Sequence, residues 1–384
     1  MNLILRSALI CGALGLIYFL SPQRLQAQVS CTHDPANCCW ENAGTYTLTQ
    51  SQFNCAEMFV GAGAILEFDS SVSDPITFNI SGDVQIDGRV DVSANGRIAG
   101  PGGGNGGEAP DTATGGDGGN GQGLGAGEGG QGSNDVFSEF TAGGGAGAKH
   151  SGILTVNNGF SGDGNGGEAS GSSYGNPLNF RQTISAGSGG GAGGSGSNFT
   201  SFGQAGYGGG GGGTIRILIE GTLWLNGEIF ADADNGSPAN VSSNSGGGGG
   251  GSGGSIFVSA LEDIIIDIGA SLSAFAGAGG TGNNGAGNGS DGDHGYIHLE
   301  DQNETIPLAT DVSSPNATTR TNPLTITQPI SGDTRIFQSD LSTGCAVSMN
   351  IHKHSSHNVI NHFILILSFG FLLLFLFSTF FIKD

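Results

Sequence analysis

The chain has 384 residues, of which 76 are glycine, and its formal net charge is −22. Glycine is far above the average of ~7 %, but it follows no fixed Gly-X-Y period, which excludes collagen. A chain this acidic repels phosphate backbones and attracts divalent cations only weakly, so nucleic acid is excluded as a partner.

The first segment has the pattern of a secretory signal peptide over residues 1–27. Arg6 precedes an apolar run over residues 8–20, Ser21 and Pro22 break it, and Ala27 is the expected cleavage point. An uncleaved anchor helix is the alternative, but the run is shorter than the ~20 residues of a membrane span.

Residues 28–60 are predicted to form a cysteine-rich N-terminal cap. Four cysteines cluster there: Cys31, Cys38, Cys39 and Cys55. In an oxidising compartment they would form two disulfides with three possible connectivities, the adjacent Cys38 and Cys39 pairing outward. A zinc site is the rival hypothesis, but there is no second CxxC pair and His33 is the one nearby imidazole.

An internal repeat follows. With an offset of 139 residues, the apolar positions and two glycines of residues 76–94 coincide with those of residues 215–233. A third copy with small insertions begins at Ile256, and fragments of a coil occur at residues 153–156 and 296–299. Apolar residues alternate with a period of two in each copy, which is typical of β-strands.

Three short strands in about twenty residues cannot bury a face alone, but they can when stacked on neighbouring copies. We therefore expect an all-β fold, a right-handed β-solenoid or β-helix over residues 61–300, in which Ala94, Ala233 and Ala276 suit a tight inner corner. Hairpins of a β-sandwich are the alternative.

Glycine-rich tracts separate the copies, at residues 100–132, 143–147, 187–196, 208–213, 246–254 and 277–289. Such tracts bury little apolar surface, so long flexible loops are the default expectation. The alternative is that glycine allows close backbone approach, as in packed polyproline-II strands. The runs 208–213 and 246–251 lead into the first strand of a copy, which favours a structural role for those two.

The most reactive-looking stretch is Asp291-Gly292-Asp293-His294-Gly295. It could form an acid/base couple or a metal site, although a solvated turn between glycines is the simpler interpretation. Residues 162–167 and the Asp291 stretch echo a calcium-binding turn, but never in tandem. The cationic side chains of the body are widely scattered: Lys149, Arg89, Arg97, Arg181 and Arg216.

The sequence contains no nucleophile elbow, His-Glu-x-x-His or phosphate loop, so no enzyme and no cofactor is predicted. The alternative is a surface-anchored polysaccharide-active enzyme, since a β-helix can carry such chemistry but fold does not imply function.

The sequence of the C-terminal part predicts a stalk followed by a membrane anchor or sorting tail. Residues 301–343 are rich in Ser, Thr, Asn and Pro, and residues 344–384 contain an uncharged apolar run at 363–382. That run has the length of one transmembrane helix, and a buried core helix is the alternative.

The runs GGGGGGTIRI and GGGGGGSGGSIFV resemble glycine-rich β-helical bacterial surface proteins. Gly344 and Cys345, a polar spacer, the apolar run and Lys383 resemble a three-part sorting tail of the MYXO-CTERM type. The resemblance implies processing and lipid attachment at Gly344-Cys345. This chain departs from the family in ending with one lysine and Asp384 rather than several arginines, and its spacer is long.

A glycolipid-anchor signal with its site at residues 342–344 or 355–356 is the eukaryotic alternative. Sequons occur at Asn79, Asn198, Asn235, Asn240, Asn288, Asn303 and Asn316, and they do not decide between the two.

We therefore expect an exported structural or adhesive protein, anchored at the cell surface or outer membrane by its C-terminal tail. The expected partners are the membrane, and extracellular polysaccharide or other surface proteins.

Overall fold

The computed structural model describes residues 34–152, 154–169, 171–174, 184–241, 244–301, 313–314 and 318–320. The chain divides into two compact units, Met1–Phe337 and Gln338–Asp384, and all described residues lie in the first. The predicted signal peptide and C-terminal anchor lie outside the described residues. In the described part, no helix is both long and apolar enough to cross a membrane.

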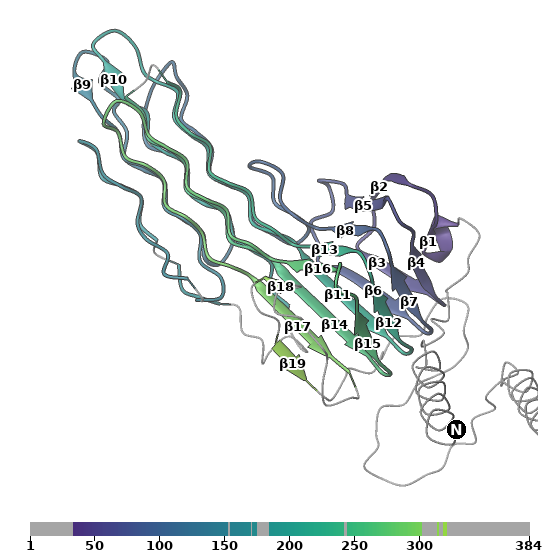
Figure 1. The fold of residues 1–384 in the computed structure, drawn as a ribbon. Helices are drawn as coiled ribbons and strands as arrows, with labels where there is room; N and C mark the ends of the chain where they lie inside the picture. Colours follow the sequence, from purple (N-terminus) through teal and green to yellow (C-terminus); the bar gives the residue numbers. More distant parts are fainter. Residues whose placement is uncertain are drawn as a thin grey trace, which may run out of the picture. The chain divides into compact units, whose positions relative to one another are not determined.

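The described chain is all-β and is built on three parallel sheets (Figure 1). Sheet A is ordered β1 (Cys39–Trp40), β4 (Met58–Val60), β7 (Val84–Ile86), β12 (Leu223–Leu225), β15 (Ile264–Ile266). Sheet B is ordered β2 (Gly44–Leu48), β5 (Ala64–Phe68), β8 (Arg89–Asp91), β13 (Glu228–Phe230), β16 (Ser271–Ser273), β18 (Ser313–Ser314). Sheet C is ordered β3 (Gln52–Cys55), β6 (Ile76–Ile80), β11 (Thr214–Ile219), β14 (Ser255–Ala260), β17 (Tyr296–Glu300), β19 (Thr318–Arg320).

From β3 to β17 the strands of the three sheets follow a fixed cycle, C then A then B, so that each coil stacks on the one before it. The ladder pairs Ile215 with Ile76, Leu223 with Val84 and Ile229 with Val90, which is the predicted offset of 139 residues. Alternate residues of β11 point inward and are fully buried, and the core runs through all coils as one apolar cluster. The predicted β-solenoid is thus consistent with the sheets, and the sandwich alternative is wrong.

The third copy has the looser register that the sequence indicated. Ile264 pairs with Leu223 at an offset of 41 residues, but Leu272 pairs with Ile229 at 43, so the two extra residues lie between β15 and β16. The coil fragment predicted at 296–299 is β17, whereas residues 154–156 form no strand.

The buried residue that ends each coil lies one inward-facing position, that is two residues, before the residue predicted for the inner corner. Val92, Ala231 and Ala274 are buried, whereas the predicted corner residues Ala94, Ala233 and Ala276 are only half-buried.

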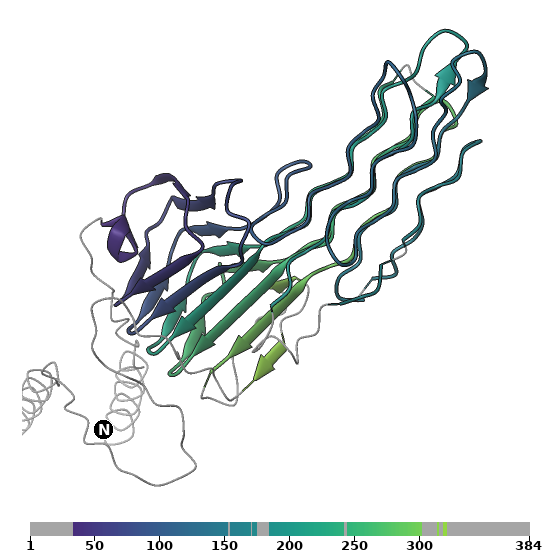
Figure 2. The same ribbon diagram turned by 180° about the vertical axis from the view of Figure 1, so that it is seen from behind.

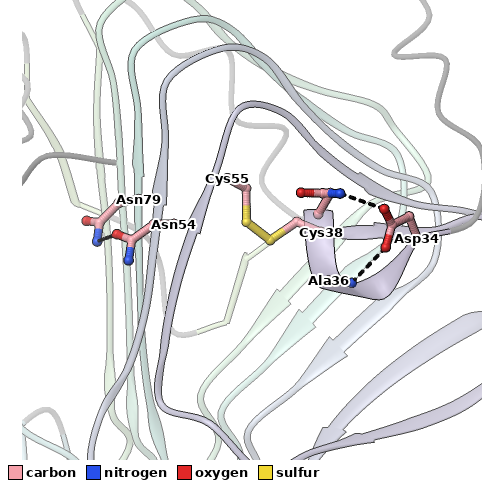
Figure 3. The surroundings of a disulfide bond; sticks show 7 residues. Asp34, Ala36, Cys38, Asn54, Cys55 and Asn79 are labelled. Atoms are coloured by element: carbon pink, nitrogen blue, oxygen red, sulfur yellow. Dashed lines mark hydrogen bonds between the residues drawn. A yellow bond between two sulfur atoms is a disulfide. The ribbon is translucent and has the colours of Figure 1, made fainter. Parts of the chain in front are cut away.

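The first coil is fastened by a disulfide between Cys38 and Cys55, whose Cα atoms are 6.0 Å apart (Figure 3). Cys38 follows the short 3-10 helix η1 (Pro35–Asn37), and Cys55 ends β3, so the bond ties the chain entry to sheet C. Cys39 is also disulfide-bonded, and Cys31 lies outside the described residues. The prediction that Cys38 pairs with a cysteine other than its neighbour Cys39 is confirmed. Within the predicted cap, β2 pairs with β5 and β3 pairs with β6, so these strands belong to the solenoid sheets.

The glycine-rich segments leave the solenoid at one corner, between sheet B and sheet C. They are residues 92–213 between β8 and β11, 231–254 between β13 and β14, and 274–295 between β16 and β17. Figures 1 and 2 show them running side by side as long extended tracts away from the sheets. We call the described residues of these three segments the glycine bundle.

Backbone hydrogen bonds hold the glycine bundle together with a period of three residues. The tract 203–213 illustrates it, since successive amides donate in three directions. In one direction, the donors are Gly206, Gly209 and Gly212, and the acceptors are the carbonyls of Gly246, Gly249 and Ser252, in that order. In the second direction, Gly208 donates to Gly107 and Gly211 to Gly104. In the third, Gly210 donates to Gly96 and Gly213 to Val92. Three residues per turn without internal hydrogen bonds is the geometry of polyproline II.

Glycine is required because the tracts approach so closely. A methyl group on Gly190 would overlap the carbonyl oxygen of Gly249, and one on Gly208 would overlap that of Gly190. The expectation of flexible loops is therefore wrong for the described tracts. The close backbone approach of the alternative is confirmed, and the three-residue period is the one expected of packed polyproline-II strands. The hydrogen bonds to several neighbouring tracts offset the entropy of ordering that argued for flexible loops.

Candidate functional site

The turns of the glycine bundle farthest from the sheets meet in one place, which we call the tip. It comprises residues 110–116, 134–141, 197–203, 240–241 and 281–286. There β9 (Glu139–Phe140) pairs antiparallel with β10 (Ser197–Asn198), and both lie at the far end of the bundle (Figure 1). Asn283 Nδ2 also donates to the carbonyl of Asn240 at 2.9 Å, joining turns from the second and third segments.

The tip contains a cavity of about 260 Å³. Its walls are neutral and mostly polar, and they come from two segments of the bundle: Thr112, Gly196, Ser197, Asn198, Ser201, Phe202, Gly203, Gln204, Asn240 and Asn244. Amide and hydroxyl groups can both donate and accept hydrogen bonds, so such walls suit a neutral ligand with many hydroxyls.

Two asparagines shape the cavity. Asn198 Oδ1 accepts from the backbone nitrogens and hydroxyls of Thr200 and Ser201 at 3.0 to 3.3 Å, which closes an Asx turn. Asn244 is buried, and its Nδ2 donates to the carbonyl of Ser197 at 2.8 Å. The cavity wall is therefore fixed by side-chain bonds to the backbone.

Exposed apolar side chains also occur at the tip. Phe137 and Val241 are 83 % and 85 % exposed, and Phe199 is 57 % exposed with a left-handed φ of 68°. A bulky residue with φ above zero is uncommon and marks a constrained turn. Large apolar groups exposed together at one end of a protein are a feature of interaction surfaces.

The Asp291 stretch does not form one acid/base cluster. Asp291 Oδ1 accepts from Gly279 N at 2.8 Å, and His294 Nδ1 accepts from Ala276 N at 3.1 Å. Burial lowers the pKa of His294. Because a polyproline-II tract has three residues per turn, neighbouring side chains point to different segments.

Asp293, the third member of that stretch, is fully buried and fastens a loop. It accepts hydrogen bonds from Leu154 N at 2.9 Å, from the Ser151 hydroxyl at 3.1 Å, and from the amides of His150 and Gly152. Its carboxylate thus holds residues 150–152 and 154 against the tract 286–295. The solvated turn expected for this stretch is therefore wrong at Asp293, whose buried carboxylate has a structural role.

His150 was not singled out from the sequence, yet it lies in a buried polar cluster beside Asp293. Its Nδ1 lies 2.7 Å from the Gly253 carbonyl, so Nδ1 carries the proton, and its ring packs on Tyr174 at 4.8 Å between centroids. Its Nε2 is buried without a partner among the described residues. Burial lowers the pKa of His150 to about 4 and raises that of Tyr174 to about 12.

The predicted calcium-like turn at residues 162–167 is closed by protein groups. Asp163 Oδ2 accepts from the amide and the hydroxyl of Thr141, both at 2.9 Å, and these bonds lower the pKa of Asp163. Across the described ranges, no group of three or more His, Cys, Asp or Glu side chains is placed to hold a metal ion.

The cationic side chains of the body stay apart in the structure. Arg89 pairs with Glu228 at 2.6 Å, and Arg97 pairs with Glu108 at 2.8 Å. The guanidinium of Arg216 lies over the Phe257 ring, 5.6 Å from its centroid. Arg181, Gly344 and Cys345 lie outside the described residues.

No protein-family model, no curated protein and no solved structure matches this chain. Its function is therefore argued from its own residues and geometry.

Proposed function

We propose that this protein is a cell-surface-anchored structural or adhesive protein. In this proposal the solenoid is the base, the glycine bundle is an ordered spacer, and the tip contacts molecules outside the cell. Export and anchoring rest on the signal-peptide and tail patterns of residues 1–27 and 344–384.

One observation carries the proposal: all three glycine-rich segments leave the same corner of the solenoid, and their distal turns meet at the tip. If the three segments served unrelated purposes, there would be no reason for all of them to leave the solenoid at the same corner. Their shared origin and shared end make one surface out of residues more than 150 positions apart in the chain, such as Thr112 and Asn283.

The internal order of the bundle supports a spacer rather than a mobile brush. A tract rises ~3.1 Å per residue, so residues 203–213 span roughly 34 Å. Hydrogen bonds tie that tract to several neighbours along this length. A contact made at the tip is therefore presented at a set distance, and little entropy is lost on binding.

Attachment of native cells tests the proposal. The tip variant Phe137→Ser/Phe199→Ser/Val241→Ser removes the exposed apolar groups, and we expect attachment to fall about tenfold, because such groups act as binding hot spots. Protease added to intact cells should remove the wild-type protein, which checks that it is displayed.

Leu124→Ser/Ile268→Ser is the matched control, since these side chains are 76 % and 83 % exposed and lie outside the tip. It should attach like wild type at equal surface level. If the tip variant attaches as well as the control, adhesion through the tip is wrong. Protection of the protein from external protease would contradict surface display.

A further inference from the structure

The tip cavity differs in charge from the rest of the molecule. The chain carries 33 acidic and 11 basic side chains, but none of the ten residues that line the cavity is charged. A site for a metal ion or a cationic ligand would need carboxylates, and a site for an anion would need Arg or Lys. The neutral walls therefore select a neutral ligand.

The lining offers polar groups that the fold leaves available. Asn198 uses its Oδ1 in the turn, while its Nδ2 makes no hydrogen bond to the described part of the chain. The Thr112 hydroxyl, on an exposed residue, likewise has no bond within the described ranges. Both can donate to hydroxyl oxygens, and the Thr112 hydroxyl can also accept.

Phe202 supplies an apolar surface beside these groups. Its ring packs on Gly115, where a methyl group would meet the ring carbon Cδ1 at 2.5 Å, so its position is set by the backbone. A half-buried aromatic face next to amides and hydroxyls matches a sugar ring, which has an apolar face of C–H groups and a polar rim.

We propose that the tip cavity binds one neutral sugar residue of a polysaccharide or glycan on the surface that the protein contacts. A volume of about 260 Å³ lies just below the range of about 300–1,000 Å³ for sites of drug-sized ligands, and therefore suits one ring. This inference rests on the proposed adhesive function and names the substrate class of its tip. It requires no catalysis and no bound ion.

A glycan array is the first test, printed with neutral hexose, pentose and N-acetylhexosamine oligosaccharides and with uronate oligosaccharides. The probe is the whole exported protein. We expect a subset of neutral glycans to bind, with Kd values in the millimolar to micromolar range typical of small sites, and no preference for uronates. Isothermal titration with the best free oligosaccharide gives the Kd.

Variants of the lining residues test whether the glycan binds in the cavity. Thr112→Trp adds bulk at an exposed rim residue and should weaken binding more than tenfold, whereas Thr112→Ser should stay within about twofold because it keeps the hydroxyl. Phe160→Ala is the matched aromatic control, since Phe160 is 58 % exposed and lies outside both the tip and the cavity lining. Circular dichroism confirms that each variant is folded.

Two results overturn the inference: no neutral glycan binds, or binding is unchanged by Thr112→Trp. Either result would leave the proposed function standing if the tip variant still reduced attachment. Loss of attachment in both the tip variant and Thr112→Trp, with glycan binding lost only in the latter, is the full pattern that we expect.

Discussion

At the scale of single residues, His150 makes the stability of the fold depend on pH. Burial holds its pKa at about 4, whereas an unfolded histidine titrates near 6.5. Between these values the unfolded chain binds the extra proton, so the free energy of unfolding is retained above about pH 6.5 and falls as the pH drops toward 4. The contribution of this residue to the loss should be about 3 kcal/mol.

Urea unfolding at pH 7.5 and pH 4.5 measures this effect. His150→Phe keeps a ring against Tyr174 but cannot take a proton, so its stability should change less between the two pH values than that of wild type. His294→Phe is the control, because His294 is only half-buried. Equal pH dependence in wild type and His150→Phe would contradict the account.

Individual polar residues were the hardest to interpret from sequence. The cluster Asp291 to His294 stood out by its composition, but composition does not show which segments lie beside it. In the structure Asp293 bonds residues 150–152 and 154, and its buried partner among them, His150, is 143 positions away. A lone histidine after a glycine tract gives no signal that could have identified it.

At the scale of elements, the close packing of glycine tracts predicts a sharp difference between two glycine substitutions. Gly190→Ala would force a methyl group into the carbonyl oxygen of Gly249, and we expect it to destabilise the fold by about 3 kcal/mol. Gly269→Ala has no atom within 4 Å of the new methyl group, so its effect should stay within about 1 kcal/mol.

Thermal unfolding of the two variants beside wild type provides the measurement. Both substitutions lower the freedom of the unfolded chain equally, so the difference between them reports the native packing alone. Equal melting temperatures for Gly190→Ala and Gly269→Ala would mean that the tracts do not pack as described.

The strands could be predicted because their signal is local and repeated. Alternation of apolar residues indicates which face is buried, and the match at an offset of 139 residues correctly predicts the pairing of Ile215 with Ile76. The glycine tracts led to two opposite expectations, flexible loops and packed strands, because whether a tract is structurally ordered depends on the other tracts that lie beside it. A tract such as 208–213 has no side chains to pack, so only its position among the other tracts determines whether its amides are bonded.

At the scale of the whole molecule, the tip is the part that no sequence pattern indicated. Its cavity joins Thr112 and Asn198 from the first glycine segment to Asn244 from the second. Their meeting depends on the order in which the tracts pack and on their common origin at one solenoid corner. A repeat pattern identifies the coils but treats what lies between them as insertions, so the surface formed by those insertions was not predicted.

Amide hydrogen exchange of the glycine bundle tests the account most directly, because an ordered bundle is what allows the tip to be presented. Peptides covering residues 203–213 and 244–254 should exchange as slowly as those covering strands β11 and β14, since their amides are bonded to neighbouring tracts. Exchange of both tracts at the rate of an unstructured peptide, with the strands still protected, would contradict the ordered bundle and the function built on it.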